Sequence, residues 1–331
     1  MKGNIIILGC DIAKDKIDIA VIEKENNKLL SERTYPNNIK GYKRIIKQYD
    51  SMGNDLHVVM EATGNYHIKF IDFLEGNNIN FSVVNPLTIK RFAQMKMIRL
   101  KTDKVDAKTI AQYGVEQNPG IYKPLTEPQK KIKSLRTVLS NLIKQRTMTK
   151  NLLHSQKLLS ESNKESIRAI KSVLKTLDKQ IKSLEKQIEN LIKEHFNGIY
   201  KNILSIKGVG PKTASGIIAY MGDLSNFDSY KQIASYIGIT PAIKESGNTL
   251  RKYSGITKQG NSTLRTLFYL AALSASKYNQ ACKELYERLL AKGKRKKTAL
   301  IAVANKLVKQ LFAIVKFNRT FINNYNFILD S

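Results

Sequence analysis

The chain has 331 residues, of which 42% are hydrophobic and 25% are charged. These proportions are ordinary for a globular protein and exclude wholesale disorder. Lysine and arginine together number 56 against 27 aspartate and glutamate, so the formal net charge is +29. Such an excess opposes compaction unless a polyanion neutralises it, and nucleic acid is the usual polyanion. The alternative is a basic surface that is simply solvated.

Two cysteines and four histidines are too few for a disulfide framework or a cysteine-based zinc site. No apolar run approaches the roughly 20 residues that a membrane-spanning helix needs. The short apolar stretch at the start meets Asp11 too soon to be a signal peptide. We therefore expect a soluble, cytoplasmic protein with no membrane partner.

Residues 4–126 are expected to alternate between strands and helices, since short apolar runs bounded by turn residues alternate with segments of helical spacing. Three early strands followed by alternating helices and strands predict a mixed sheet covered by helices, an α/β domain. The predicted strands are Ile5–Cys10, Ile17–Ile22, Leu29–Tyr35, Leu56–Met60 and Asn80–Val84, and the predicted helices are Ile39–Tyr49, Tyr66–Leu74, Pro86–Met97 and Thr102–Gln117.

The rest of the chain is expected to be mainly α. In residues 127–197, leucine, isoleucine and valine recur at spacings of three and four, interrupted by the polar stretch 160–164. This pattern predicts a long helical hairpin with a coiled-coil seam, suited to a dimerisation arm. Residues 198–331 form a mostly helical third region. The predicted domains are therefore 1–126, 127–197 and 198–331.

The third region opens with an apolar segment, the turn Gly208-Val209-Gly210, and a second segment of small residues. This arrangement resembles a helix-hairpin-helix, whose turn exposes backbone N–H groups where a phosphate can bind. Lys207 and Lys212 flank the turn and favour nucleic-acid binding there. The alternative is a plain glycine-rich loop between two core helices.

Four carboxylates stand at special positions in a chain with few acidic residues. Asp11 and Glu61 each follow a predicted strand, and Asp103 and Asp106 are spaced i and i+3 near the start of a predicted helix. That spacing places both aspartates on one helical face. Carboxylates gathered in this way suit Mg²⁺, which can activate a nucleophile and stabilise a leaving oxygen in phosphodiester cleavage. Taken singly, each has a structural alternative: a turn residue, a helix cap, or a charge favourable at a helix N-terminus.

The order of these motifs resembles a ribonuclease H-like, RuvC-like nuclease core. The segments Gly9–Lys14, Met60–Tyr66 and Lys101–Ala107 are similar to the DEDD insertion-sequence transposases of the IS110 family. The second half resembles the C-terminal transposase domain of the same family. The segments that carry this second resemblance are Ile206–Pro211, Gly238–Pro241, Ser246–Gly247, Ile256–Asn261 and Leu264–Arg265.

The resemblance implies a DNA transposase or recombinase of an insertion sequence. It implies that Asp11, Glu61, Asp103 and Asp106 hold Mg²⁺, with Mn²⁺ also plausible, and that Ser246 is a nucleophile that becomes covalently linked to DNA. It further implies a structured non-coding (bridge) RNA that pairs with donor and target DNA. The protein would act as a homodimer or homotetramer with a composite site, at the bacterial nucleoid.

The residues around Ser246 support its role less strongly than the resemblance does. The segment is polar and carries Lys244 and Arg251, which can stabilise charge at a backbone phosphate. Tyr253 and Ser254 are competing hydroxyl groups, and Ser246 has the alternative of being an ordinary loop residue.

Two further basic residues, Lys258 and Arg265, lie in the segments that carry the resemblance, and we expect them to bind nucleic acid. Three rival functions remain open. One is a site-specific DNA invertase of the same architecture, and another is a junction-resolving nuclease that uses water in place of serine. The third is a nucleic-acid-binding protein without catalysis, against which the intact carboxylates argue.

Overall fold

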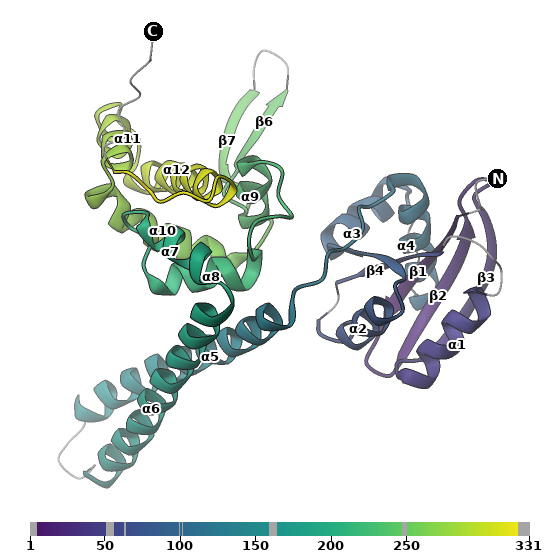
Figure 1. The fold of residues 1–331 in the computed structure, drawn as a ribbon, viewed down its shortest axis with the longest axis horizontal. Helices are drawn as coiled ribbons and strands as arrows, with labels where there is room; N and C mark the ends of the chain where they lie inside the picture. The colour runs from purple at the N-terminus through teal and green to yellow at the C-terminus, as the bar shows by residue number, and fades with distance from the viewer. Residues whose placement is uncertain are drawn as a thin grey trace. The chain divides into compact units, whose positions relative to one another are not determined.

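The chain folds into two compact units, Met1–Pro124 and Leu125–Ser331, drawn as a ribbon in Figure 1 from a computed structural model. The structure describes residues 5–50, 56–62, 64–98, 100, 102–158, 164–246 and 250–323. For Asp50 and for residues 243–246 and 250–254 it describes the backbone alone. Each unit is described by itself below, and the three-part division expected from the sequence stays a prediction.

The first unit is built on a five-stranded mixed sheet with the strand order β3-β2-β1-β4-β5. The first three strands pair antiparallel, whereas β4 pairs parallel with both β1 and β5. This topology confirms the ribonuclease H-like fold class expected from the sequence. The strands are β1 (Ile6–Ile12), β2 (Lys16–Glu23), β3 (Lys28–Pro36), β4 (Leu56–Glu61) and β5 (Asn80–Val84), and the helices are α1 (Ile39–Asp50), α2 (Ile68–Gly76), α3 (Pro86–Met95) and α4 (Asp103–Gln117).

Helices cover both faces of this sheet (Figure 1). Because side chains alternate along a strand, Ile6, Leu8 and Cys10 of β1 are buried against α1 and α2 on one face. Ile7 is buried on the opposite face, in a cluster with residues of α3 and α4. The core is therefore two apolar layers separated by the sheet, and α4 lies on the face to which the odd-numbered residues of β1 point.

The second unit begins with a pair of long helices, α5 (Glu127–Leu158) and α6 (Lys164–His195), which pack against each other. This pair confirms the helical arm expected from the sequence. It continues into a helical region, as expected, whose core is one large apolar cluster. The helices of that region are α7 (Asn197–Ser205), α8 (Pro211–Met221), α9 (Tyr230–Ile237), α10 (Ser262–Tyr278), α11 (Gln280–Ala291) and α12 (Lys296–Lys316).

The last of these helices, α12, is long and apolar enough to cross a membrane, although the sequence analysis expected no such stretch. In this structure its apolar side is packed in the core of the second unit. The buried residues of α12 are Ala299, Leu300, Val303, Ala304, Leu307, Val308, Leu311 and Ile314. The helix therefore has one face in the core and one face bearing polar residues.

A two-stranded antiparallel sheet, β6 (Pro241–Ser246) with β7 (Leu250–Ile256), interrupts the helices. The sequence indicated a polar, flexible segment there. Charged residues pair across the hairpin, for example Glu245 with Arg251. The two strands therefore lack the alternation of apolar and polar residues from which strands are usually predicted. The hairpin is the main element of the fold that the sequence did not indicate.

Candidate active site

Three carboxylates lie on the same face of three neighbouring strands. Asp11 pairs with Asp18 across β1 and β2. The parallel pairing of β1 with β4 ends at Cys10 opposite Met60, so Asp11 and Glu61 are the next residues on their strands. By strand alternation all three carboxylates belong to the face covered by α4. The carboxyl-terminal edge of the parallel pair is therefore acidic.

The start of α4 is brought to this edge by glycines that let the helix lie directly on β1. A Cβ atom on Gly9 would lie 2.2 Å from the amide nitrogen of Ala111 and 2.4 Å from the carbonyl oxygen of Ala107. One on Gly114 would lie 2.6 Å from a methyl group of Ile7. Since Ile7 meets the end of α4 and Gly9 meets its middle, the helix runs antiparallel to β1. Its first turn therefore reaches the edge where β1 ends.

That first turn carries the other two predicted carboxylates, Asp103 and Asp106. Thr102 caps the helix, its hydroxyl oxygen accepting a hydrogen bond from the amide of Val105 at 3.3 Å. Asp103 is exposed and Asp106 is half-buried. The four carboxylates singled out in the sequence thus come from β1, β4 and α4, and the fold directs all of them to one edge of the sheet.

The electrostatics of Asp11 reflect this crowding. Burial, and after it the nearby charges of Asp106, Asp103, Glu61 and Asp18 in that order of strength, together raise the pKa of the Asp11 carboxyl to about 6. Like charges disfavour ionisation of a neighbouring carboxyl group. A cation placed among these groups would relieve the repulsion.

Lys16 supplies one such cation in the structure. Its ammonium nitrogen lies 2.6 Å from Oδ2 of Asp103 and 3.0 Å from Oδ2 of Asp18. The hydrogen bond from Lys16 holds the pKa of Asp103 below its usual range, and the same contacts raise the pKa of Lys16. Asp18 is buried and also accepts a 2.5 Å hydrogen bond from the hydroxyl of Thr34. Lys16 therefore links the start of α4 to β2.

The carboxylates of this edge are chemically suited to a divalent metal, although they lie too far apart to enclose one. Among the residues that the structure describes, no three His, Cys, Asp or Glu side chains are gathered tightly enough to hold a metal ion. The donor set is nonetheless entirely carboxylate, which is the kind of ligand that Mg²⁺ and Mn²⁺ prefer. The contact between Lys16 and Asp103 occupies one of these carboxylates.

Ser246 is the last residue of β6 and pairs with Leu250 of β7. It therefore stands at the end of a strand. Gly247, its neighbour in the motif, lies outside the described residues. The competing hydroxyl residues Tyr253 and Ser254 lie within β7. Lys244 and Arg251 lie on opposite strands of the hairpin, where Lys244 pairs with Lys252 and Arg251 pairs with Glu245.

The turn Gly208–Gly210 lies between two helices, α7 and α8, as expected for a helix-hairpin-helix, and Gly208 has a packing role. Gly208 has a φ of +101°, and a Cβ atom there would lie 2.6 Å from the Cβ atom of Ala275. Lys207 is exposed. Lys212 lies on α8, and its ammonium nitrogen is 3.2 Å from a carboxylate oxygen of Glu185 on α6. Gly210 is the N-cap of α8 and has open space around it.

The two remaining predicted nucleic-acid contacts differ in their surroundings. Arg265 is half-buried and donates a 2.9 Å hydrogen bond to the carbonyl of Ile237, at the end of α9. Lys258 is exposed, and its backbone amide donates to the carbonyl of Gly238. The structure thus gives Arg265 a structural contact and leaves the side chain of Lys258 at the surface.

Comparison with known proteins identifies the family. A family described as "Transposase", of the DEDD type of IS110, matches residues 8–164, and the "Transposase IS116/IS110/IS902 family" matches residues 200–287. The "Pilin gene-inverting protein" of Moraxella bovis is 32% identical over 327 residues, which cover 95% of this chain and 97% of that protein. The chain belongs to the IS110 family of transposases.

Two further comparisons complete these findings. The "Transposase for insertion sequence element IS1111A" of Coxiella burnetii is 26% identical over 96% of this transposase and 92% of that protein. A solved structure titled "T. thermophilus RuvC in complex with Holliday junction substrate" aligns with a TM-score of 0.29 and 11% identity, over 37% of this chain and 99% of that one. Transposases cut and rejoin DNA, and this family generally uses a divalent metal.

Lys16 and Asp18 are the residues of the acidic edge that the sequence analysis missed. The signal for Asp18 was present, because a tight turn after β1 places residue 18 opposite residue 11 in the hairpin. Lys16 had no comparable signal. Its partner Asp103 lies 87 residues further along the chain.

Proposed function

We propose that this transposase cleaves and rejoins DNA at a Mg²⁺-dependent site formed by Asp11, Glu61, Asp103 and Asp106, with Ser246 as the nucleophile. The observation that carries the proposal is the convergence of the four carboxylates from β1, β4 and α4 on one edge of the sheet. Membership of a family of DNA-rejoining enzymes supports it.

In this scheme the hydroxyl oxygen of Ser246 attacks the phosphorus of a DNA phosphodiester. The serine proton leaves, the bond from phosphorus to the deoxyribose oxygen breaks, and that oxygen takes up a proton to become a free hydroxyl end. The product is a phosphoserine ester, which conserves the energy of the broken bond. Attack by a DNA hydroxyl on this ester reverses the chemistry and rejoins the strands.

The residues of the chain have different roles in this reaction. A serine hydroxyl is a weak nucleophile at neutral pH and needs a group that accepts its proton. A divalent cation held by the carboxylates supplies charge stabilisation at the reacting phosphate. We assign the binding of flanking phosphates to Lys244 and Arg251, which belong to the same hairpin as Ser246. Cleavage by this route requires serine and carboxylates to act on the same phosphodiester.

The test is covalent trapping of DNA. Wild-type protein with Mg²⁺ and its element-end DNA should form an adduct that survives denaturation and contains a phosphoserine at Ser246. Ser246→Ala should abolish the adduct and keep DNA binding, and Asp11→Asn should abolish cleavage and keep DNA binding. Ser254→Ala and Tyr253→Phe are the matched controls and should retain the adduct.

The same experiment separates the alternatives. Loss of the adduct in Ser254→Ala or Tyr253→Phe, with retention in Ser246→Ala, moves the nucleophile to the other residue. Efficient cutting by the wild type with no adduct indicates a nuclease that uses water.

A second candidate function is site-specific DNA inversion. It is favoured by the relatives named as pilin gene-inverting proteins, which align with nearly the whole chain. The two functions use the same chemistry on different substrates. A plasmid with two recombination sites in inverted orientation tests inversion, and a donor plasmid with a separate target tests transposition. Sequencing of the products shows which junctions form.

We further propose that a structured non-coding RNA guides target choice. The net charge of +29 supports a large polyanionic partner. RNA recovered with the protein from cells that carry the whole element should map to its non-coding flank and be complementary to donor and target. Removal of that RNA by ribonuclease should abolish site-specific cleavage, and cleavage that persists unchanged contradicts guidance.

We also propose that α5 and α6 join two copies of the chain. Large apolar side chains on this helical pair are exposed, among them Val138, Met148, Leu152 and Val173. Light scattering should show a dimer or tetramer for the wild type and a smaller species for Met148→Glu. Lys150→Gln, on the same helix and with the same change in charge, is the control and should leave the mass unchanged.

A further inference from the structure

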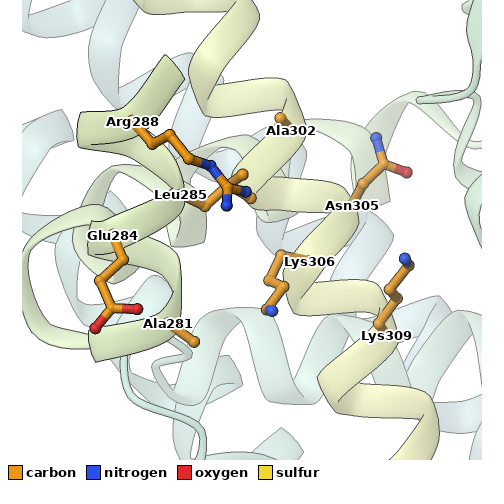
Figure 2. A pocket seen from close by; sticks show the side chains of 8 residues that line it. All are labelled: Ala281, Glu284, Leu285, Arg288, Ala302, Asn305, Lys306 and Lys309. Carbon is orange, nitrogen blue, oxygen red and sulfur yellow. The ribbon is translucent and has the colours of Figure 1, made fainter. Parts of the chain in front are cut away.

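A concave groove lies between α11 and α12, on the polar side of α12. Its volume is about 330 Å³, at the lower end of the range for ligand sites in proteins, about 300–1,000 Å³. Figure 2 shows Arg288 of α11 and Lys306 of α12 extending into the space between the two helices. Lys309 stands one turn further along α12. The groove residues are Ala281, Glu284, Leu285, Arg288, Ala302, Asn305, Lys306 and Lys309.

The cations of this groove have no ion-pair partner among the described residues. Within the part of the chain that the structure describes, no carboxylate lies within 4.0 Å of the charged nitrogens of Arg288, Lys306 or Lys309. The groove lining includes one carboxylate among the residues described, Glu284, which accepts a 2.7 Å hydrogen bond from Gln280 on its own helix. The groove therefore has a positive field and donors that can bind an anion.

The helix that carries two of these cations is fixed in the fold. The opposite side of α12 is buried in the core of the second unit, and Lys306 follows directly after Asn305, whose amide donates hydrogen bonds to the carbonyls of Ile239 and Ile301. Lys309 rests over the ring of Tyr230, with its ammonium nitrogen 4.8 Å from the ring centre. Charges on a rigid surface lose less conformational entropy on binding than charges on a loop.

The charge continues beyond the groove. The turn from α11 into α12 carries Lys292, Lys294 and Arg295, and the segment 288–316 contains nine lysines and arginines and no aspartate or glutamate. A small anion would use only the groove itself. A polyanion with charges at regular intervals would use both the groove and the turn, which favours a nucleic-acid strand over a free anion.

We propose that the groove between α11 and α12 binds a backbone phosphate of nucleic acid, through Arg288 and Lys306, with Lys309 and the basic turn contacting neighbouring phosphates. This site lies outside the carboxylate edge and outside the hairpin of Ser246. It anchors the strand and does not take part in the chemistry. Its ligand chemistry is the phosphodiester, from either DNA or RNA.

The test is equilibrium binding at several salt concentrations, with all variants made in the Ser246→Ala protein so that covalent attachment cannot distort the measurement. The probes are a fluorescein-labelled DNA duplex and an RNA hairpin, both of unrelated sequence. The groove variant is Arg288→Gln/Lys306→Gln. The control is Lys201→Gln/Lys277→Gln, which removes the same charge from exposed positions outside the groove.

Loss of one phosphate contact should lower the slope of log affinity against log salt by about 1 in the groove variant. The control should lower it by less than half as much. A lower salt slope with the DNA probe assigns the groove to DNA, and a lower salt slope with the RNA hairpin assigns it to RNA. Equal changes in the groove variant and in the control, with both probes, would overturn the proposal.

A second measurement does not depend on substitutions. Lysines are acetylated with a reagent of low selectivity, and the modified residues are identified by mass spectrometry. Acetylation of Lys306 should slow severalfold when nucleic acid is bound, and acetylation of Lys277 should stay unchanged. Unchanged labelling of Lys306 would also overturn the proposal. Neither measurement involves cleavage, so both test the groove even when no serine adduct forms.

Discussion

The ammonium nitrogen of Lys16 lies 2.6 Å from a carboxylate oxygen of Asp103. This contact joins the hairpin that follows β1 to the first turn of α4, across 87 residues of chain. It also places a fixed positive charge beside the carboxylates proposed to hold a metal. A metal that binds Asp103 therefore competes with Lys16 for the same oxygen atoms.

The first prediction follows from that competition. Lys16→Gln should bind Mn²⁺ roughly three- to tenfold more tightly than the wild type, because one nearby positive charge is removed and Asp103 is released. Isothermal titration of the metal-free protein with Mn²⁺ measures the affinity. Lys14→Gln, an exposed lysine two residues earlier, is the control and should leave it unchanged. Weaker binding in Lys16→Gln would show that Lys16 positions Asp103 for the metal.

The second prediction concerns Gly9. Gly9→Ala places a methyl group against the backbone of α4 at Ala107 and Ala111, and neither atom can move without shifting the helix. We expect a loss of about 3 kcal/mol in the free energy of unfolding, at the upper end for overpacking. Urea unfolding measures the loss of stability, and faster hydrogen exchange in β1 and α4 should show where the structure is weakened.

The control for this substitution is Gly76→Ala, at the end of α2. A Cβ atom there meets nothing within 4 Å, so the change should be neutral or stabilise by up to about 1 kcal/mol. Equal stability of Gly9→Ala and the wild type would mean that α4 does not depend on close contact with β1.

The third prediction is a pH dependence at Asp11. Burial, followed by the charges of neighbouring carboxylates, raises the pKa of Asp11 to about 6, above about 3.9 for an unfolded aspartate. The folded state therefore binds the proton more tightly, so the ionisation of Asp11 lowers the free energy of unfolding as the pH rises from about 4 to about 6.

In metal-free buffer, Asp11→Asn should thus be more stable than the wild type at pH 7, by about 1 kcal/mol once solvent screening at this half-exposed site is included. The difference should vanish near pH 4. Urea midpoints across this pH range measure it, with the exposed Asp15→Asn as a control that should show no such trend. A variant less stable than the wild type at pH 7 would contradict the prediction.

The fourth prediction separates the two lysines beside the turn of Gly208. Lys212 is paired with Glu185, whereas Lys207 has no ion pair with any residue that the structure describes. Lys207→Gln should therefore lower the salt slope of DNA binding by about 1, and Lys212→Gln should lower it less. Fluorescence anisotropy at several salt concentrations measures both slopes. Equal effects would assign the two lysines equivalent phosphate contacts.

The fold of the first unit was largely predictable because most of its strands are short apolar runs and because α3 and α4 begin at the capping residues Asn85 and Thr102. The apolar run Ile5–Cys10 predicted a strand, and β1 is found at Ile6–Ile12. The strand continues through Asp11 because Asp11 pairs with Asp18, and a polar residue at a strand end carries no such signal.

The candidate site was predictable only in part, for a similar reason. Asp11, Glu61, Asp103 and Asp106 follow recognisable elements, and their convergence depends on strand order and on the packing of α4, which a motif can suggest. The contacts of Lys16 and of Arg265 with Ile237 depend on tertiary structure alone. The hairpin β6–β7 is highly charged, so its pairing could not be inferred from hydrophobic alternation.

The close packing of α4 on Gly9 has a consequence for biosynthesis. Asp11 and Glu61 leave the ribosome early, while the helix that completes the acidic edge and covers that face of the sheet ends at Gln117. A nascent or truncated chain that stops before α4 lacks part of the helical cover on one apolar face of its sheet and holds only two of the four carboxylates. Incomplete products of translation that end before α4 therefore cannot form the proposed four-carboxylate site.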